Sequence, residues 1–93
     1  MVLKKNDYYL NKLYKNPKAR IAEYLAIPDQ KRAEIFLLLR RHIQFEVAKG
    51  LNNDQRKLLL EALDPDDATD VLQFFDKNTQ KNLIESLSND IQE

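Results

Sequence analysis

Apolar residues recur along this chain with a period of 12. The positions from residue 27 onward that are 12 apart are all apolar, and so are those from residue 24 onward. The first series, the boundary residues, is Ile27, Leu39, Leu51, Leu63, Phe75 and Leu87, and the second, the inner residues, is Tyr24, Phe36, Ala48, Leu60, Leu72 and Ile84. Because the offset between the series is constant, the chain consists of copies of one short unit, and we expect all twelve side chains in the core.

The residue after each boundary position is in most units a good helix N-cap. These residues are Pro28, Arg40, Asn52, Asp64, Asp76 and Ser88, and Asn16 lies one period before Pro28. Pro17 and Pro65 then fall at the first helical position, where proline is tolerated. Each unit is predicted to hold a cap, a helix of about eight or nine residues and a short connection. Gly50 is expected just past a helix end, in the left-handed conformation.

Helices this short are unstable alone in water, so they must pack against their neighbours. The chain has one Gly, three Pro and no strand-like alternation, which indicates an all-α fold of stacked short helices. Ahead of the repeat, Leu3, Leu10, Leu13 and Tyr14 predict one more helix. We therefore expect a single domain over residues 1–93, with a capping helix in 1–15 and repeats in 16–93.

Length and composition exclude several classes of protein. The 93 residues suffice for one modest core, and the lack of cysteine excludes disulfides, thiolate catalysis and cysteine-ligated zinc. The longest apolar run is Ile35–Leu39, far short of the ~18 residues of a membrane-spanning helix. No apolar segment follows the N-terminal lysines, so we expect neither membrane insertion of this chain nor secretion.

The formal net charge is zero, but the charges are unevenly distributed. Residues 1–60 carry thirteen Lys and Arg against six acids, whereas residues 61–93 carry two lysines against nine acids. The acidic end would attract cations or basic partners, although an ordinary solvated surface also accounts for it.

Catalysis and nucleic-acid binding find little support in the sequence. His42 is the only histidine, and no nucleophile with a positioning acid accompanies it, so we expect a surface histidine and no enzyme. Arg40 and Arg41 beside it form a basic cluster without interleaved aromatic residues or a groove-reading motif. We interpret this cluster as solvated surface and expect no nucleic-acid partner.

The segment LDPDDATDVL, residues 63–72, holds four aspartates at a predicted helix start. Asp64 can cap the first turn, and Asp66 and Asp67 gain from the positive helix end. Asp70 lies beyond that benefit and pairs with Asp66 and Asp67 at spacings of four and three, where like charges repel. Two accounts remain open: capping with solvation, or a weak, open Mg²⁺ site that a second surface completes.

The run LLLEALDPDDATDVLQFFDKNTQKNLIESL and the upstream PDQKRAEIFLLL resemble the intracellular N-terminal domain of MgtE-type magnesium transporters. The resemblance covers residues 16–93. It implies a right-handed superhelix of short helices, followed in the whole protein by CBS domains and a dimeric pore in the bacterial inner membrane. This chain would then be a cytoplasmic fragment that lacks the CBS and pore domains.

The resemblance also implies regulatory Mg²⁺ between this domain and the CBS domains. Its D-D-x-x-D motif falls on Asp66, Asp67 and Asp70, and a glutamate of an earlier unit falls on Glu34. The implied mechanism is a charge switch, in which Mg²⁺ bridges acidic faces and favours a closed pore. The alternative is a protein-interaction module, similar to the helical repeats of the flagellar motor switch protein FliG.

Overall fold

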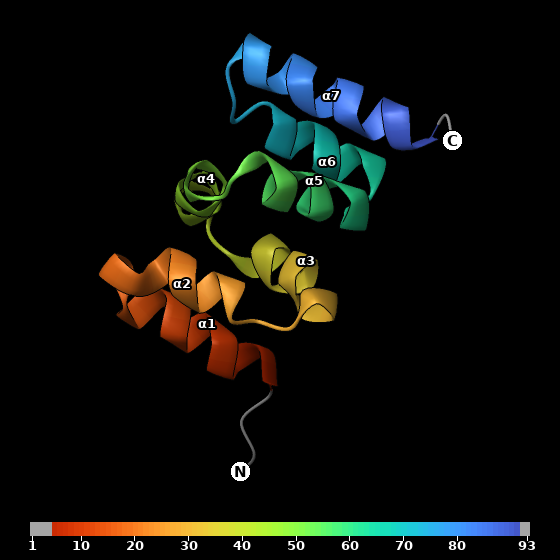
Figure 1. Cartoon of the computed structure of the whole chain (residues 1–93). Helices are drawn as coiled ribbons and strands as arrows, with labels where there is room; N and C mark the ends of the chain where they lie inside the picture. The colour runs from red at the N-terminus through yellow and green to blue at the C-terminus, as the bar shows by residue number, and fades with distance from the viewer. Residues whose placement is uncertain (1–4, 92–93) are drawn as a thin grey trace. The chain divides into compact units, whose positions relative to one another are not determined.

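The computed structural model of the chain describes residues 5–91, with side chains described from residue 6 to residue 87 (Figure 1). This part contains seven α-helices, one 3-10 turn and no strand. The helices are α1 (Lys5–Lys15), α2 (Arg20–Leu25), α3 (Asp29–Leu38), α4 (Arg41–Gly50), α5 (Asn53–Ala62), α6 (Pro65–Leu72) and α7 (Lys77–Ile91), and the turn η1 (Pro17–Ala19) precedes α2. The predicted all-α class is confirmed.

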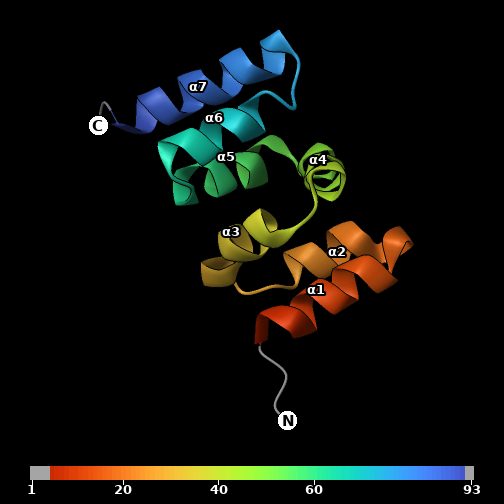
Figure 2. The ribbon, with the colours of Figure 1, turned by 180° about the vertical axis from the view of Figure 1, so that it is seen from behind.

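The helices form two compact units, Met1–Val47 and Ala48–Glu93. In the first unit α2 and α3 both pack against α1, and in the second α6 and α7 both pack against α5 (Figures 1 and 2). The helix α1, predicted from Leu10, Leu13 and Tyr14, is present, while Leu3 lies outside the described residues. The single domain and the right-handed superhelical winding stay predictions.

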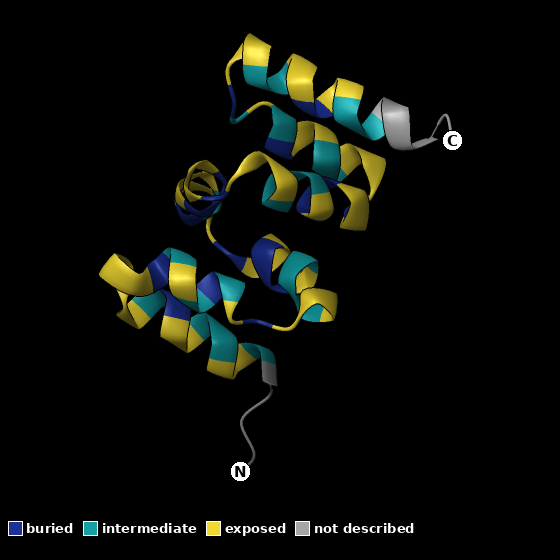
Figure 3. Cartoon of the chain, viewed as in Figure 1, coloured by how far each residue is buried: buried dark blue, intermediate teal, exposed yellow. Residues whose placement is uncertain are grey.

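The predicted core is largely confirmed (Figure 3). Of the twelve boundary and inner residues, nine are buried, and Leu72 and Leu87 are half-buried. The prediction that Ile84 lies in the core is wrong, because this residue is 47% exposed while its neighbour Leu83 is buried. The reason is that α7 continues past Leu87, so the chain does not turn into a further helix there, as it does after the other inner residues.

A third buried series was missed by the sequence analysis. It lies one position before the inner residues and consists of Ile35, Val47, Leu59, Val71 and Leu83. In α3, α4 and α5 it gives two adjacent buried residues, as a helix with neighbours on both sides requires. The series keeps the period of 12, which is the signal that could have revealed it.

The repeat is also a repeat of backbone hydrogen bonds. In five consecutive units the N–H of the boundary residue donates to the carbonyl of the inner residue, three positions earlier. The pairs are Ile27 to Tyr24 at 3.1 Å, Leu39 to Phe36 at 3.1 Å, Leu51 to Ala48 at 3.4 Å, Leu63 to Leu60 at 3.3 Å and Phe75 to Leu72 at 3.1 Å. Each pair closes the last turn of a helix, so both series are buried where one helix ends and the next begins.

Two predictions about helix ends are wrong. Gly50 is the last residue of α4 instead of following it, and no glycine in the described residues has positive φ. After the comparable helices α3 and α5, the chain continues in extended conformation at Leu39 and Leu63, with φ −74° and −94°. A residue in the left-handed conformation is therefore not needed at these helix ends. Ser88 does not begin a new helix, because α7 runs through this position to Ile91.

The fourth residue of most helices holds the end of the helix before it. These fourth-position donors are Arg20, counted from Pro17, with Arg32, Gln44, Arg56 and Gln80. Each side chain donates a hydrogen bond to a backbone carbonyl five to eight residues earlier. At Phe36 and Ala48 the side chain is a second donor to a carbonyl that also accepts a backbone N–H, so it ties the next helix to the end of the one before it. The arginines at 20, 32 and 56 keep the period of 12 and were the available signal.

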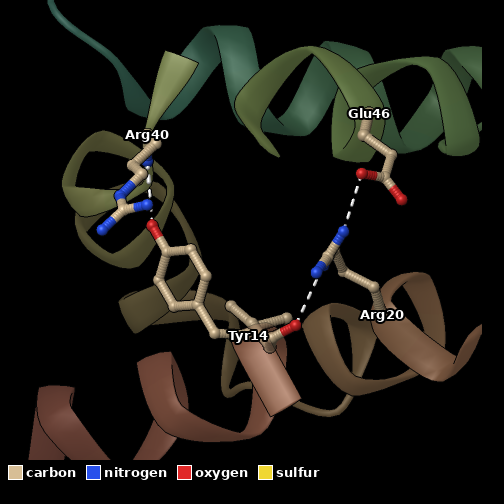
Figure 4. A network of polar contacts seen from close by, with 5 residues as sticks. Tyr14, Arg20, Arg40 and Glu46 are labelled. Carbon is tan, nitrogen blue, oxygen red and sulfur yellow. Dashed lines mark hydrogen bonds and ion pairs between the residues drawn. The ribbon is translucent and has the colours of Figure 1, made fainter. Parts of the chain in front are cut away.

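A buried arginine connects the elements of the first unit (Figure 4). Arg20 is 7% exposed, its Nε donates to the Leu13 carbonyl at 2.9 Å, and its Nη1 pairs with Glu46 Oε2 at 2.7 Å. On the other side of the same view the Tyr14 hydroxyl accepts a hydrogen bond from the backbone N–H of Arg40 at 3.0 Å. These contacts tie α1 to α2 and to the residues around α4.

Candidate metal site

The three aspartates of the predicted site lie on α6. The chain reaches this helix through Asp64, which is extended at φ −62° and ψ 155°, and Pro65 takes the first helical position. Asp66 and Asp70 are therefore one turn apart, and Asp67 precedes Asp70 by three residues. The helix places these three carboxylates on one side, as the spacing argument requires.

The prediction that the Asp64 side chain caps α6 is wrong. Its carboxylate accepts no hydrogen bond from the first turn of the helix. That turn already carries Asp66 and Asp67, and their charges repel a third carboxylate from the same amides. In the next unit Asp76 does act as a cap, since its Oδ1 accepts from the Thr79 N–H at 2.7 Å. Capping by Asp64 therefore does not explain the negative charge at the start of α6, although the sequence suggested that it would.

The carboxylates of α6 are accessible. Asp66 and Asp70 are exposed, and Asp67 is half-buried. Among the described residues none of the three forms an ion pair or accepts a hydrogen bond, and α6 itself carries no basic residue. Their mutual repulsion is thus compensated by water and counter-ions rather than by the chain.

These aspartates do not make a complete metal site. Within the part of the chain that the structure describes, no group of three or more His, Cys, Asp or Glu side chains is placed so that it could hold a metal ion. Mg²⁺ keeps several of its waters and uses one or two protein carboxylates, so α6 offers part of a ligand set.

Glu34, the fourth predicted ligand, lies on α3 in the first unit, whereas the aspartates belong to the second. Its Oε2 accepts a hydrogen bond from Asn6 Nδ2 at 2.6 Å and lies 3.4 Å from Lys31 Nζ. The hydrogen bond from Asn6, and then the charge of Lys31, lower the pKa of this exposed carboxyl. Glu34 thus links α3 to α1, and its role as a ligand stays a prediction.

The remaining candidates are a basic surface cluster and a pocket in the first unit. Arg40, Arg41 and His42 are exposed, as predicted for a surface cluster. A pocket of about 190 Å³ in the first unit is lined by Tyr8, Tyr9, Lys12, Glu23, Ala26 and Ile27. Contact with Tyr8, whose ring centroid is 4.7 Å from Lys12 Nζ, raises the pKa of Lys12. This lining supplies an aromatic surface with one cation and one acid.

Comparison with protein-family models decides the class of this chain. The model of the MgtE intracellular N domain matches residues 8–93. The chain belongs to this family. The resemblance found in residues 16–93 is confirmed and extends into α1.

Membership gives the MgtE N domain a general role. It is an intracellular, regulatory N-terminal domain of a magnesium transporter, and its family is not a catalytic one. Neither the search of curated proteins nor the search of solved structures gives a match. In the described residues, no helix combines the length and the hydropathy that crossing a membrane requires.

Proposed function

We propose that this MgtE N domain senses intracellular Mg²⁺ and thereby regulates the pore of its transporter. The observation that carries the proposal is the set of three carboxylates on one side of α6, accessible and without a partner in the described chain. In a regulatory domain of a magnesium transporter, the simplest role for uncompensated carboxylates is to bind the transported ion as a signal.

The mechanism follows from the repulsion among these charges. Asp66, Asp67 and Asp70 repel one another and any acidic surface that approaches α6. A divalent cation between two such surfaces reverses the sign of the interaction, so high Mg²⁺ favours a docked state and low Mg²⁺ a separated state. The ion shifts the population only through its higher affinity for the docked state.

The partners in this proposal belong to the full-length protein. The second acidic surface would come from CBS domains of the same chain, and the pore would be a homodimer in the bacterial inner membrane. Mg²⁺ would be bound weakly by the isolated domain, because only part of its ligand set is present. Glu34 would join the site only if Mg²⁺ displaces the contacts to Asn6 and Lys31.

A magnesium titration of the isotopically labelled domain tests the proposal. We expect small, saturable amide shifts in the millimolar range, confined to residues 65–73. The double variant Asp66→Asn, Asp70→Asn removes two ligands without changing side-chain size and should abolish the saturable shifts. As a matched control, Asp54→Asn alters an exposed aspartate in the first turn of α5 and should leave them intact.

Two outcomes of the titration would contradict the sensing proposal. Shifts of similar size at all acidic residues, or shifts that persist in the double variant, would mean that Mg²⁺ only screens the surface charge. The domain would then be better described as a protein-interaction module, with α6 as an acidic face for a basic partner.

A further inference from the structure

The 12-residue repeat that contains α6 lacks the side-chain hydrogen bond that its fourth residue donates at the other helix junctions. Its fourth residue is Ala68, which has no side-chain donor. At two equivalent junctions the acceptor is the inner residue: Gln44 Nε2 donates to the Phe36 carbonyl at 2.9 Å, and Arg56 Nε to the Ala48 carbonyl at 3.0 Å. The corresponding carbonyl for Ala68 is that of Leu60, eight residues earlier.

The Leu60 carbonyl otherwise has the same environment as its equivalents. It accepts the N–H of the boundary residue Leu63 at 3.3 Å, as Phe36 and Ala48 accept from Leu39 and Leu51. The α5–α6 junction therefore has the same backbone hydrogen bond as the other junctions. It differs from them in lacking a side-chain donor to the carbonyl of the inner residue.

Full burial in α6 is limited to its C-terminal end. Val71 is its only buried residue among eight, and its first turn has no side-chain cap. The segment after it is held more firmly, since Gln80 Nε2 donates to the Phe75 carbonyl at 2.8 Å and the Arg56 guanidinium lies 4.4 Å from the Phe75 ring centroid. The aspartates of α6 thus lie on a helix that has one fully buried residue, no side-chain cap and no fourth-position donor.

We infer that α6 is a conformational element that separates from α5 while α5 and α7 remain packed together. The helices α5 and α7 pack against each other, and Leu59 of α5 and Leu83 of α7 are both buried. An eight-residue helix without tertiary contacts is unstable in water, so separation of α6 also breaks its internal hydrogen bonds. The separation is therefore a local unfolding that stops short of global unfolding.

This local unfolding deepens the proposed function, and its regulatory meaning depends on that function. The aspartates keep their spacing only while α6 is helical, so a cation held by two of them favours the packed state of α6. Fixing α6 permanently would remove this coupling. Ala68 is thus the residue that allows α6 to respond.

Native-state hydrogen exchange of the domain tests the inference without Mg²⁺. We expect the amides of residues 68–73 to exchange at least tenfold faster than the central amides of α5 and α7. Ala68→Gln restores a donor at the equivalent position and should slow the α6 amides about tenfold, with little change in α5. Ala68→Met, which has similar length and no donor, is the matched control and should not slow them.

Three outcomes would overturn the inference: α6 amides as slow as those of α5, equal slowing by Gln and Met, or equal slowing throughout the unit. Adding MgCl₂ to the wild-type domain and to the Asp66→Asn, Asp70→Asn variant separates the two proposals. Slower exchange of the α6 amides with Mg²⁺ in the wild type, but not in the variant, supports the coupling. Fast α6 exchange that Mg²⁺ leaves unchanged refutes the sensing role and leaves the local unfolding established.

Discussion

Arg20 shows how unequal the two partners of an ion pair are in this fold. The arginine side chain is 8% exposed, whereas that of Glu46 is 48% exposed. Water can replace the arginine as partner of Glu46, but it cannot easily reach the Leu13 carbonyl or the space that the arginine stem fills. The energetic role of the pair therefore lies mostly with Arg20.

We expect Arg20→Ala to lower the free energy of unfolding by about 2–4 kcal/mol, because it removes a buried hydrogen bond and leaves a cavity. Glu46→Ala should lower it by less than about 1 kcal/mol, as is usual for a half-exposed partner. Urea denaturation of both variants at pH 7 measures the difference. Equal losses would mean that the ion pair itself, rather than the burial of Arg20, is what stabilises the first unit.

At the scale of the helices, the starts of α5 and α6 look alike in sequence but differ in structure. Asn52 Oδ1 accepts from the Gln55 N–H at 2.8 Å, and the Gln55 side chain accepts from the Asn52 N–H at 2.9 Å, which completes a capping box. Asp64 occupies the same place in the repeat and makes no such bond. The difference comes from the residues that follow, since α5 begins with a neutral first position and α6 with proline and two acids.

Replacing each of these residues by alanine measures that difference. Asn52→Ala should lower the free energy of unfolding by about 1 kcal/mol, the usual cost of losing an N-cap. Asp64→Ala should change it by no more than about 0.5 kcal/mol, since no bond is lost and one repulsion is removed. Chemical denaturation under identical conditions provides the comparison. A loss at Asp64 as large as that at Asn52 would show that the aspartate caps α6 in solution.

The period of 12 predicted the helices and most of the core because both follow from local pattern. Boundary residues such as Leu39 and Leu51 are buried wherever one helix turns into the next. The pattern failed at Ile84, where the chain continues as one helix. It placed the arginines of the fourth-position donors at regular intervals but did not give their role, since an arginine such as Arg56 looks like surface until tertiary structure places the carbonyl it contacts.

The candidate site was predicted less completely than the fold. The spacing of Asp66, Asp67 and Asp70 was sufficient to place them on one side of a helix, because helix geometry alone decides it. Lys31 and Glu34 are a local pair on α3, three residues apart, but the contact of Glu34 with Asn6 depends on the packing of α1 against α3, and Asn6 lies 28 residues away in sequence. No local pattern contains that information.

At the scale of the whole chain, the uneven charge coincides with the two structural units. The unit 1–47 holds ten Lys and Arg against five acids, and the unit 48–93 holds five against ten. The uneven charge found in the sequence is thus a difference between two separately packed units. Cations and basic partners are attracted to the second unit, which contains α6, and salt weakens that attraction.

Acid should destabilise both units through one carboxylate in each. The hydrogen bond from Asn6 and the charge of Lys31 lower the pKa of Glu34, and the hydrogen bonds from Thr79 lower that of Asp76. A carboxyl whose pKa is lower in the folded state stabilises it at pH values above its unfolded pKa. That contribution is lost as the pH falls toward the folded pKa, so stability should decrease between about pH 5 and pH 3.

The variants Glu34→Gln and Asp76→Asn isolate this effect, because each keeps a hydrogen-bond acceptor while removing the charge. We expect each to flatten the decrease of unfolding free energy with falling pH, and the double variant to flatten it most, since the two groups lie in different units and act independently. Urea denaturation at a series of pH values provides the slopes. If the double variant keeps the wild-type slope, other carboxylates cause the acid sensitivity, and neither contact holds its unit together in solution.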